Sequence, residues 1–382
     1  MTNSKGINGK IIFLNTVFPM ETRHAADGQL ANLVYNLNKN GIDSSVALLI
    51  RNPLFERGTY HTLRSRLAKT IVSIDRRIPD LYRRVILGYK KSDLIQVKSF
   101  PIWDVCDLSH SHPHFVVTWD WVSAYYLNKC NAPSFRKIQV LHYGPLEEYL
   151  KDYMPADLTP KVVEAYYSGM TKVAISKKQI GDFNGRKVYH WLQGINVDIF
   201  FRQKTSIGDP PRILIPLRNP KEKGAIYALQ AAEIIFRHNR DVAINSFGDY
   251  KGNIPGFINH HGRVNFSTLL ELYRGSDIFV IPSIEEGFSL PGLEAMASGC
   301  ALVSTRNGGS EQYITDRHDG ILVEPGDSLA LANAVIELIE NRRLLKKIIV
   351  NARETVREYS YEKATERFIE ILRNIEENPS ET

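Results

Sequence analysis

The chain has 382 residues, 43% of them hydrophobic and 24% charged, which is the composition of an ordinary globular protein of two or three domains. No apolar run reaches the roughly 18 residues of a membrane span, and the first ten residues lack the apolar stretch of a signal peptide. The cysteines (Cys106, Cys130, Cys300) form no CxxC pair, which predicts reduced thiols in a cytoplasmic protein and argues against a metal site.

The net charge of +6 is concentrated in one segment. Between residues 57 and 91 there are ten Lys or Arg and two acids, a local charge of +8, which leaves −2 for the rest of the chain. The basic residues gather in this one insertion without an RNA-binding motif. The sequence therefore argues against a nucleic-acid partner.

The first half of the chain alternates short apolar runs with helical patterns. Leucines and a valine recur at helical spacing within residues 28–41 and stop at Gly41, which predicts a helix between strands at 10–15 and 44–50. Strand–helix–strand order with a tight return is typical of a parallel sheet. Further strands are predicted at 94–100, 115–118, 137–143 and 172–176.

A second alternation begins near Arg212, after a Gly- and Pro-rich linker at 194–211. Strands are predicted at 212–217, 241–248, 277–283, 301–305 and 320–326, and helices at 224–239, 268–275, 293–299 and 328–341. We therefore expect an α/β protein with two doubly wound domains, 1–200 and 201–358, and a C-terminal helix in 359–382 that packs back on the first domain. Ligands of such sheets bind beyond the carboxyl ends of the strands, which favours a site in a cleft between the domains.

Residues 282–299, PSIEEGFSLPGLEAMASG, place two glutamates around a strand-to-helix turn. Glu286 follows a predicted strand, and Pro291 suits the first turn of the helix that contains Glu294. Free amides at a helix start attract anions such as phosphate, while carboxylates accept hydrogen bonds from hydroxyls. A sugar nucleotide offers both kinds of group. In the competing interpretation, Glu294 only complements the helix dipole and Glu286 is only a solvated loop residue.

The same stretch closely resembles the E-x7-E region of family-four glycosyltransferases, which are retaining enzymes with the GT-B fold. The resemblance continues through GCALVSTRNGGSEQYI (299–314) and GILVEPGD (320–327). Upstream, RILIPLRNPKEKG (212–224) is similar to the family's strand and basic loop, and residues 262–283 resemble its base-binding turn, helix and strand. The resemblance covers essentially the whole second domain and, more loosely, the first domain. In the first domain, residues 116–129 resemble bacterial surface-glycan rhamnosyltransferases.

The resemblance implies a nucleotide-diphosphate-sugar donor and a role for each matching residue. Glu294 would accept hydrogen bonds from the ribose, and Glu286 would face the donor sugar. Arg218 and Lys223 would neutralise the leaving diphosphate, so that neither a metal nor another cofactor is expected. The remaining nucleotide contacts would be Val264, in the base-binding turn, and the amides near the diphosphate, those of Gly287, Phe288, Ser289 and Leu290.

The first domain matches less closely. His142 ends the predicted strand 137–143, where the family places a His near the donor sugar; a purely structural buried His is the competing interpretation. After the first strand the family carries paired glycines, but here Asp27 precedes Gly28. Gly28 still allows close approach to a phosphate, whereas Asp27 would disfavour one unless it faces the acceptor. The spacing of HSHPH (110–114) suits a loop or strand rather than a metal site.

The sequence thus predicts a retaining glycosyltransferase that moves a sugar to a glycan or lipid-linked glycan acceptor in bacterial surface polysaccharide synthesis. A GT-B-fold sugar-nucleotide epimerase or hydrolase is the alternative. Residues 63–85 carry an apolar stripe at helical spacing, interrupted at Pro79. This pattern predicts either surface helices on the first domain with a solvated basic face, or a peripheral contact with anionic lipid on the inner face of the membrane.

Overall fold

The computed structural model describes residues 7, 9–17, 25–50, 96–101, 108, 112–130, 134–142, 159–181, 183, 186–201 and 206–378. The chain divides into an N-terminal unit, residues 1–191 and 364–382, and a C-terminal unit, residues 192–363. The predicted boundaries at 200/201 and 358/359 lie nine and five residues away. Two crossing segments explain the difference, because Ile195 pairs with the backbone of Tyr359 and Tyr361 within the C-terminal unit.

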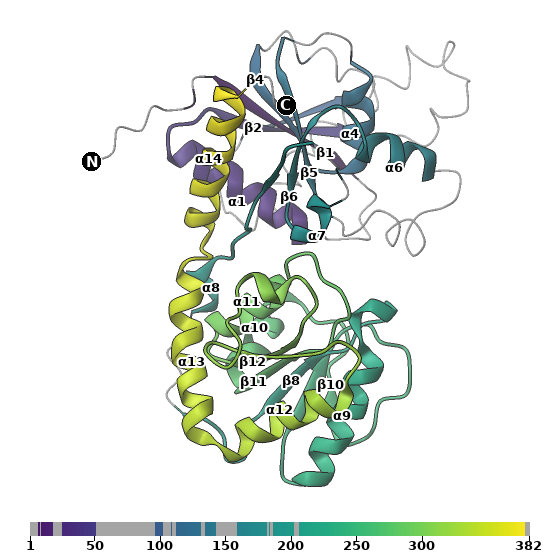
Figure 1. The fold of residues 1–382 in the computed structure, drawn as a ribbon, viewed down its shortest axis with the longest axis vertical. Coiled ribbons are helices and arrows are strands. Elements are labelled where there is room, and N and C mark those ends of the chain that lie inside the picture. The colour runs from purple at the N-terminus through teal and green to yellow at the C-terminus, as the bar shows by residue number, and fades with distance from the viewer. Residues whose placement is uncertain are drawn as a thin grey trace. The chain divides into compact units, whose positions relative to one another are not determined.

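The N-terminal unit is built on a parallel seven-stranded sheet in the order β3-β2-β1-β4-β5-β6-β7 (Figure 1). Its strands are β1 (Lys10–Val17), β2 (Ser44–Ile50), β3 (Gln96–Pro101), β4 (Pro113–Thr118), β5 (Arg136–Leu141), β6 (Thr171–Ala174) and β7 (Val188–His190). The helices described for this unit are α1 (Ala25–Lys39), α4 (Trp121–Asn128), α6 (Thr159–Tyr166), α7 (Lys177–Ile180) and most of α14 (Tyr361–Glu377).

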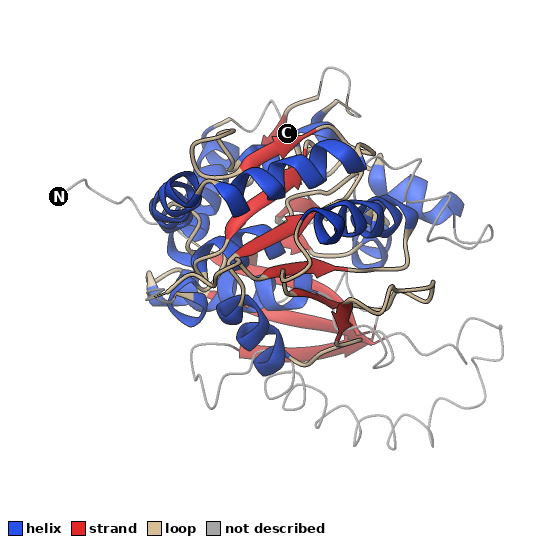
Figure 2. Ribbon diagram, turned by 90° about the horizontal axis from the view of Figure 1, so that it is seen from below, coloured by secondary structure: helices blue, strands red, loops and turns tan. Residues whose placement is uncertain are grey.

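Alternation along these strands builds a core on each face of the sheet. Phe13 and Val117 point to the face covered by α1 and α14, where Phe368 of α14 lies 6.0 Å from Phe13 between ring centroids. Ile12 and Val116, one residue earlier in each strand, join the cluster formed with α4 and α6. Helices therefore flank the sheet on both sides (Figure 2). The C-terminal helix belongs to this core, since Trp191 Nε1 donates to the Ala364 carbonyl at 2.8 Å.

The C-terminal unit holds a parallel six-stranded sheet in the order β10-β9-β8-β11-β12-β13. Its strands are β8 (Ile213–Pro216), β9 (Ile244–Phe247), β10 (Ile258–His260), β11 (Ile278–Ile281), β12 (Ala301–Thr305) and β13 (Ile321–Val323). Its helices are α8 (Val197–Phe200), α9 (Ala225–His238), α10 (Phe266–Gly275), α11 (Leu290–Ala297), α12 (Ser328–Glu340) and α13 (Arg342–Arg357), with short 3-10 turns η3 (Lys221–Lys223) and η4 (Ser310–Gln312).

This sheet also has two buried faces. Ile213 and Val280 pack with α9 and α12, whereas Leu214, Phe279 and Leu302 pack with α10 and α11. In chain order the strands run 3-2-1-4-5-6, the Rossmann order, and the order reverses between the paired strands β8 and β11. A crevice at this reversal is where sheets of this kind bind ligands. The predicted fold class, two doubly wound α/β units, is confirmed.

Every predicted strand is present, but the sequence missed several elements. Strands β7 and β10 are three residues each, too short to show alternation. Six of the eight residues of helix α4 are apolar or aromatic, so the helix has no amphipathic stripe. Helices α6 and α13 were also not predicted. The basic segment 57–91 lies outside the described residues.

Two further sequence expectations can be compared with the structure. Cys130 is disulfide-bonded, so the expectation of three reduced thiols is wrong, while Cys300 is a free buried thiol. The cytoplasmic location, which drew on reduced thiols, stays a prediction. Among the helices of the described residues, none is long and apolar enough to cross a membrane.

Candidate active site

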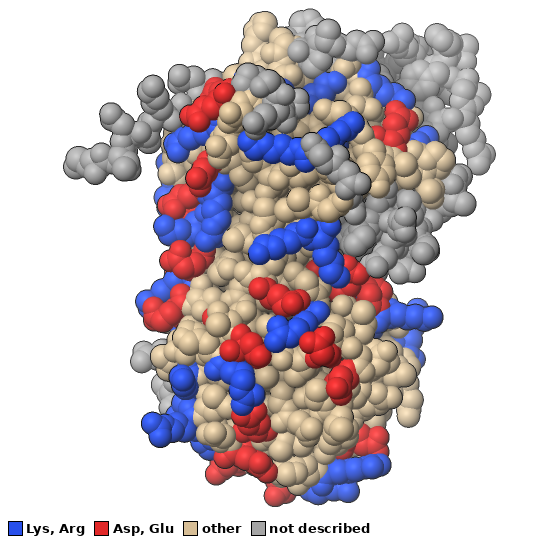
Figure 3. Space-filling view, viewed as in Figure 1, with Lys and Arg blue, Asp and Glu red and all other residues tan. Residues whose placement is uncertain are grey.

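The candidate site lies at the carboxyl ends of β8 and β11, where the strand order of the C-terminal sheet reverses. The loop after β8 carries Arg218 and Lys223, and the loop after β11 carries Glu286. On the face seen in Figure 3, Lys and Arg alternate with Asp and Glu over the C-terminal unit, without a large area of one sign.

Glu286 and Lys223 form an ion pair, with Nζ 3.1 Å from Oε1. The same oxygen accepts a hydrogen bond from Ser283 Oγ at 2.8 Å. Both side chains of the pair are about four-fifths buried, at 23% and 20% exposure, so water screens their attraction only in part. The Glu286 N–H donates to the Asn307 carbonyl at 2.9 Å, which fixes the backbone at this point.

Close packing of the two loops brings Lys223 to Glu286. The Ile284 N–H donates to the Glu222 carbonyl at 2.7 Å. Gly224 adopts a left-handed φ of +66°, and a Cβ there would lie 2.0 Å from the Pro282 carbonyl oxygen. Only glycine permits both the conformation and the approach. The η3 turn is thereby held against the end of β11.

Arg218 occupies a different environment, exposed at the end of β8. Within the described part of the chain it forms no ion pair, although its charge acts on Asp249. Burial opposes ionisation of Asp249, but hydrogen bonds from Arg263 and the Asn219 N–H, together with the Arg218 charge, lower the pKa of that carboxyl. Arg218 is therefore a cation available to an anionic ligand.

Residues 287–290 form an exceptional backbone turn between Glu286 and α11. Ser289 has φ +61° and ψ +55°, a left-handed conformation that non-glycine residues adopt rarely. Among the described residues, none accepts a hydrogen bond from the backbone N–H groups of 287–290. Phe288 anchors the turn, since its side chain is 3% exposed and packs in the core. Successive free amides next to a helix start are an arrangement that binds anions.

Glu294 lies on α11, one helical turn further on. Tyr273 of α10 donates its hydroxyl hydrogen bond to Glu294 Oε2 at 3.1 Å. Burial raises the pKa of the Glu294 carboxyl to about 7, against the opposing effect of the Tyr273 hydrogen bond. The carboxyl is therefore distributed between its neutral and charged forms at physiological pH. The sequence did not predict Tyr273 as a site residue, because its contact with Glu294 joins two separate helices and no local sequence pattern indicates such a contact.

The other predicted residues lie elsewhere. Val264 is half-buried between β10 and α10. His142 directly follows β5 in the N-terminal unit, against Trp119 at 4.6 Å between ring centroids. Burial lowers the pKa of the His142 imidazole to about 3, and its Nε2 has no hydrogen-bond partner among the described residues. Gly28, predicted in a loop–helix junction, falls in the first turns of α1. Among the described residues, no group of His, Cys, Asp and Glu could hold a metal ion.

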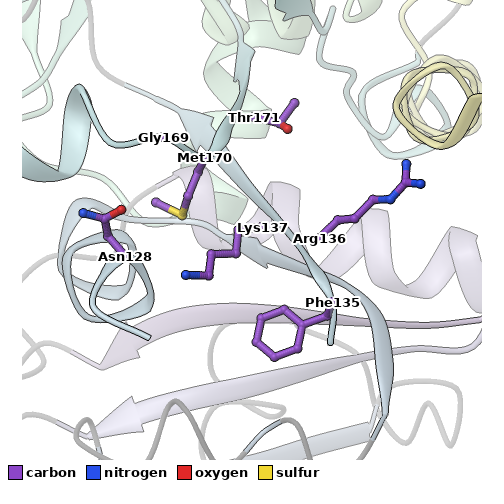
Figure 4. Close-up of a pocket in the computed structure, with 7 residues that line it drawn as sticks. All are labelled: Asn128, Phe135, Arg136, Lys137, Gly169, Met170 and Thr171. Atoms are coloured by element: carbon purple, nitrogen blue, oxygen red, sulfur yellow. The ribbon is translucent and has the colours of Figure 1, made fainter. Parts of the chain in front are cut away.

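In the N-terminal unit, a cavity of about 410 Å³ lies at the amino-terminal ends of β5 and β6 (Figure 4). Its lining includes Arg136 and Lys137. Both cations are engaged in the fold: Lys137 Nζ donates to the Cys130 carbonyl at 2.6 Å, and Arg136 donates to the last carbonyls of α14. This cavity is remote from the carboxyl strand ends and is not part of the candidate site.

Comparison with known proteins shows which family the C-terminal unit resembles. Residues 197–355 match the model of the family described as Glycosyl transferases group 1. An uncharacterized glycosyltransferase of Methanocaldococcus jannaschii is 26% identical over 245 residues, 59% of this chain and 62% of that protein. The D-inositol 3-phosphate glycosyltransferase of Corynebacterium urealyticum is 30% identical over 113 residues, 30% of this chain and 27% of that protein. The matches thus span less than two thirds of these relatives.

Solved structures extend the likeness to the whole fold. HepE of Anabaena, solved in complex with UDP and glucose, has a TM-score of 0.68 at 15% identity, covering 96% of this chain and 100% of that one. Sucrose-phosphate synthase from Thermosynechococcus elongatus has a TM-score of 0.65 at 14% identity, covering 96% and 98%. At such identities the likeness concerns the fold. The chain therefore has the GT-B fold, and its residues 197–355 match the model of the group 1 glycosyl transferases.

Proposed function

We propose that the protein is a retaining, metal-independent glycosyltransferase. It moves a sugar from a nucleotide-diphosphate donor to a glycan or lipid-linked glycan acceptor, and its product enters bacterial surface polysaccharide. The observation that carries the proposal is the convergence, at one strand-order reversal, of the Lys223–Glu286 pair with four backbone amides that have no acceptor among the described residues.

The proposed diphosphate subsite follows from charge. As the sugar–phosphate bond breaks, negative charge grows on the leaving diphosphate. Lys223, Arg218 and the amides of residues 287–290 offer fixed positive charge and oriented dipoles to that group, without a metal ion. HepE, which shares the fold, was solved with UDP and glucose, and this supports a nucleotide-sugar donor here.

The proposed stereochemical course follows from the surroundings of Glu286. Its Oε1 already accepts a hydrogen bond from Ser283 Oγ and pairs with the Lys223 ammonium. Both interactions stabilise the carboxylate as a hydrogen-bond acceptor rather than prepare it as a nucleophile. We place it beside the hydroxyls of the donor sugar. The acceptor hydroxyl then attacks the anomeric carbon on the face that the diphosphate leaves. Its proton passes to the departing phosphate oxygen, and the configuration at the anomeric carbon is retained.

The first test is a thermal-shift screen of the full chain with UDP, GDP, dTDP and ADP. A diphosphate present at 100 times its Kd should stabilise the folded state by about 2.7 kcal/mol. The corresponding nucleotide sugars are then incubated with and without a glycan acceptor, in the presence of EDTA, and the anomeric configuration of the product is read by NMR. Acceptor-independent consumption of the donor would indicate an epimerase or hydrolase and would overturn the proposal, as would inverted product.

A further inference from the structure

The loop that follows β12 packs directly against the 286–290 loop. A Cβ on Gly309 would lie 2.7 Å from Glu286 Cβ and 3.0 Å from the Phe288 carbonyl carbon, so this contact requires glycine. Asn307, which is fully buried, accepts the N–H groups of Gly309 and Ser310 at 3.0 and 2.9 Å and thereby shapes this second loop. Gln312 and Tyr313, two and three residues after Ser310, reach across to the first loop.

Their side chains hold alternate carbonyls of the candidate phosphate turn. Gln312 Nε2 donates to the Gly287 carbonyl at 2.7 Å, and the Tyr313 hydroxyl donates to the Ser289 carbonyl at 2.9 Å. In a trans peptide the N–H points opposite to the C=O of the same plane. Two fixed carbonyls therefore fix the N–H groups of Phe288 and Leu290 on the other side of the turn.

We propose that Gln312 and Tyr313 are positioning residues for donor binding. Through the carbonyls of Gly287 and Ser289 they turn the N–H groups of residues 288 and 290 toward the diphosphate of the donor. This inference rests on the proposed function. Gln312 and Tyr313 act through the backbone of residues 287–290 and do not themselves contact the donor.

The surroundings of Tyr313 suit such a role. Its side chain is 4% exposed, with its ring 5.9 Å from those of both Phe288 and Tyr359. Burial raises the pKa of the Tyr313 hydroxyl above its ordinary value, so the group stays protonated and continues to donate. The carbonyl of the left-handed Ser289 accepts both the Tyr313 hydroxyl and the Gly292 N–H, the latter at 3.0 Å, and only the first of these bonds comes from outside the turn and its helix.

The test separates the phosphate part of the affinity from the rest. We would measure the Kd of whichever diphosphate the thermal-shift screen selects, and that of the matching nucleoside by competition, for Tyr313→Phe and Gln312→Met. Each substitution removes one donor and keeps most of the side-chain volume. We expect about tenfold weaker diphosphate binding in each variant, with nucleoside affinity unchanged.

Tyr359→Phe is the matched control. It removes a hydrogen bond of similar length that a hydroxyl of the same aromatic cluster donates. The acceptor of that bond is the Gln312 carbonyl, at 2.8 Å, and not a carbonyl of residues 287–290. Its diphosphate Kd should stay within about twofold of the wild type. Unchanged diphosphate affinity in both test variants would overturn the positioning role, and so would an equal loss of nucleoside and diphosphate affinity. If the wild type binds none of the four diphosphates, the proposed function itself fails, and the inference fails with it.

Discussion

Lys223 and Glu286, from the loops after two adjacent strands, form an ion pair in which Nζ lies 3.1 Å from Oε1. The cation proposed for the diphosphate is therefore held in place by the carboxylate proposed for the sugar. The attraction restricts the positions that the ammonium can adopt. Such preorganisation is favourable for catalysis, because little reorganisation is needed when charge develops on the leaving group.

Replacing Lys223 with Met should lower kcat by about 10² while changing the donor KM less, because its charge matters most as the diphosphate departs. Arg218→Ala should act in the same direction. Lys221→Met is the matched control, since Lys221 lies in the same η3 turn but is exposed. Steady-state kinetics on the three variants provides the measurement. Wild-type turnover in the Lys223 variant would contradict the leaving-group role.

Donor affinity should depend on pH through Glu294. With its pKa raised to about 7 by burial, this carboxyl is largely neutral at pH 6 and charged at pH 8. Ribose hydroxyls donate more strongly to the charged form, so affinity should rise with pH through 7 and then level off. Calorimetry in buffers of different ionisation enthalpy should detect proton release on binding at pH 6.

The Glu294→Gln variant isolates this effect. It should bind the donor more weakly at pH 8, by about 1.5–3 kcal/mol, because a charged acceptor is lost. It should also lose the pH dependence between 6 and 8. A wild-type pH profile in this variant would mean that another group is responsible.

The sequence predicted the architecture better than it predicted the interior of the site. Strands were readable because apolar runs recur between helical patterns, and E-x7-E drew attention to Glu286 and Glu294. No local pattern, however, could pair Glu294 with Tyr273 or place Gln312 against the Gly287 carbonyl. These contacts join segments that only the folded sheet brings together. The missed helix α13 did carry a signal, an Asn341 cap followed by an amphipathic stripe.

Gly224→Ala should both destabilise the protein and lower its activity. The new Cβ would lie 2.0 Å from the Pro282 carbonyl oxygen, and alanine disfavours the φ of +66° at this position. The η3 turn would have to move away from β11, which would displace Lys223. Gly256→Ala is the control, because nothing lies within 4 Å of a Cβ there. Melting temperature and turnover of the two variants decide the point, and equal behaviour would show that the loop contact is unimportant.

Stability of the fold should rise with pH because of Lys172. Its ammonium is buried against Gln139 and Ser168, and burial, with the charge of Arg186 as a second cause, lowers the pKa of Lys172 to about 7 from 10.5. Between these values the unfolded chain binds a proton that the folded chain does not. The free energy of unfolding should therefore increase over this window, by at most about 1.4 kcal/mol per pH unit from this group.

Urea unfolding at pH 7, 8 and 9 measures this slope. Lys172→Met should reduce it, whereas Lys177→Met, at an exposed position of α7, should leave it unchanged. A slope that is the same in both variants would assign the effect to other groups.

The basic segment 57–91 suggests the last prediction, which concerns where the protein works. An acceptor linked to lipid would be reached more readily by a protein that contacts the membrane surface, and anionic lipid attracts each nearby Lys or Arg by about 1 kcal/mol. We expect the protein to sediment with anionic liposomes but not with neutral ones, and to be released by high salt. Replacing Arg76, Arg77, Arg83 and Arg84 with Ser should abolish sedimentation and leave nucleotide binding intact.

The control replaces four exposed cations of the C-terminal unit, Arg240, Arg343, Lys346 and Lys347, and changes the net charge equally. If both quadruple variants lose binding to the same degree, net charge rather than this segment is responsible. Sedimentation of the wild type with both liposome types, or with neither, would contradict the electrostatic contact with anionic lipid.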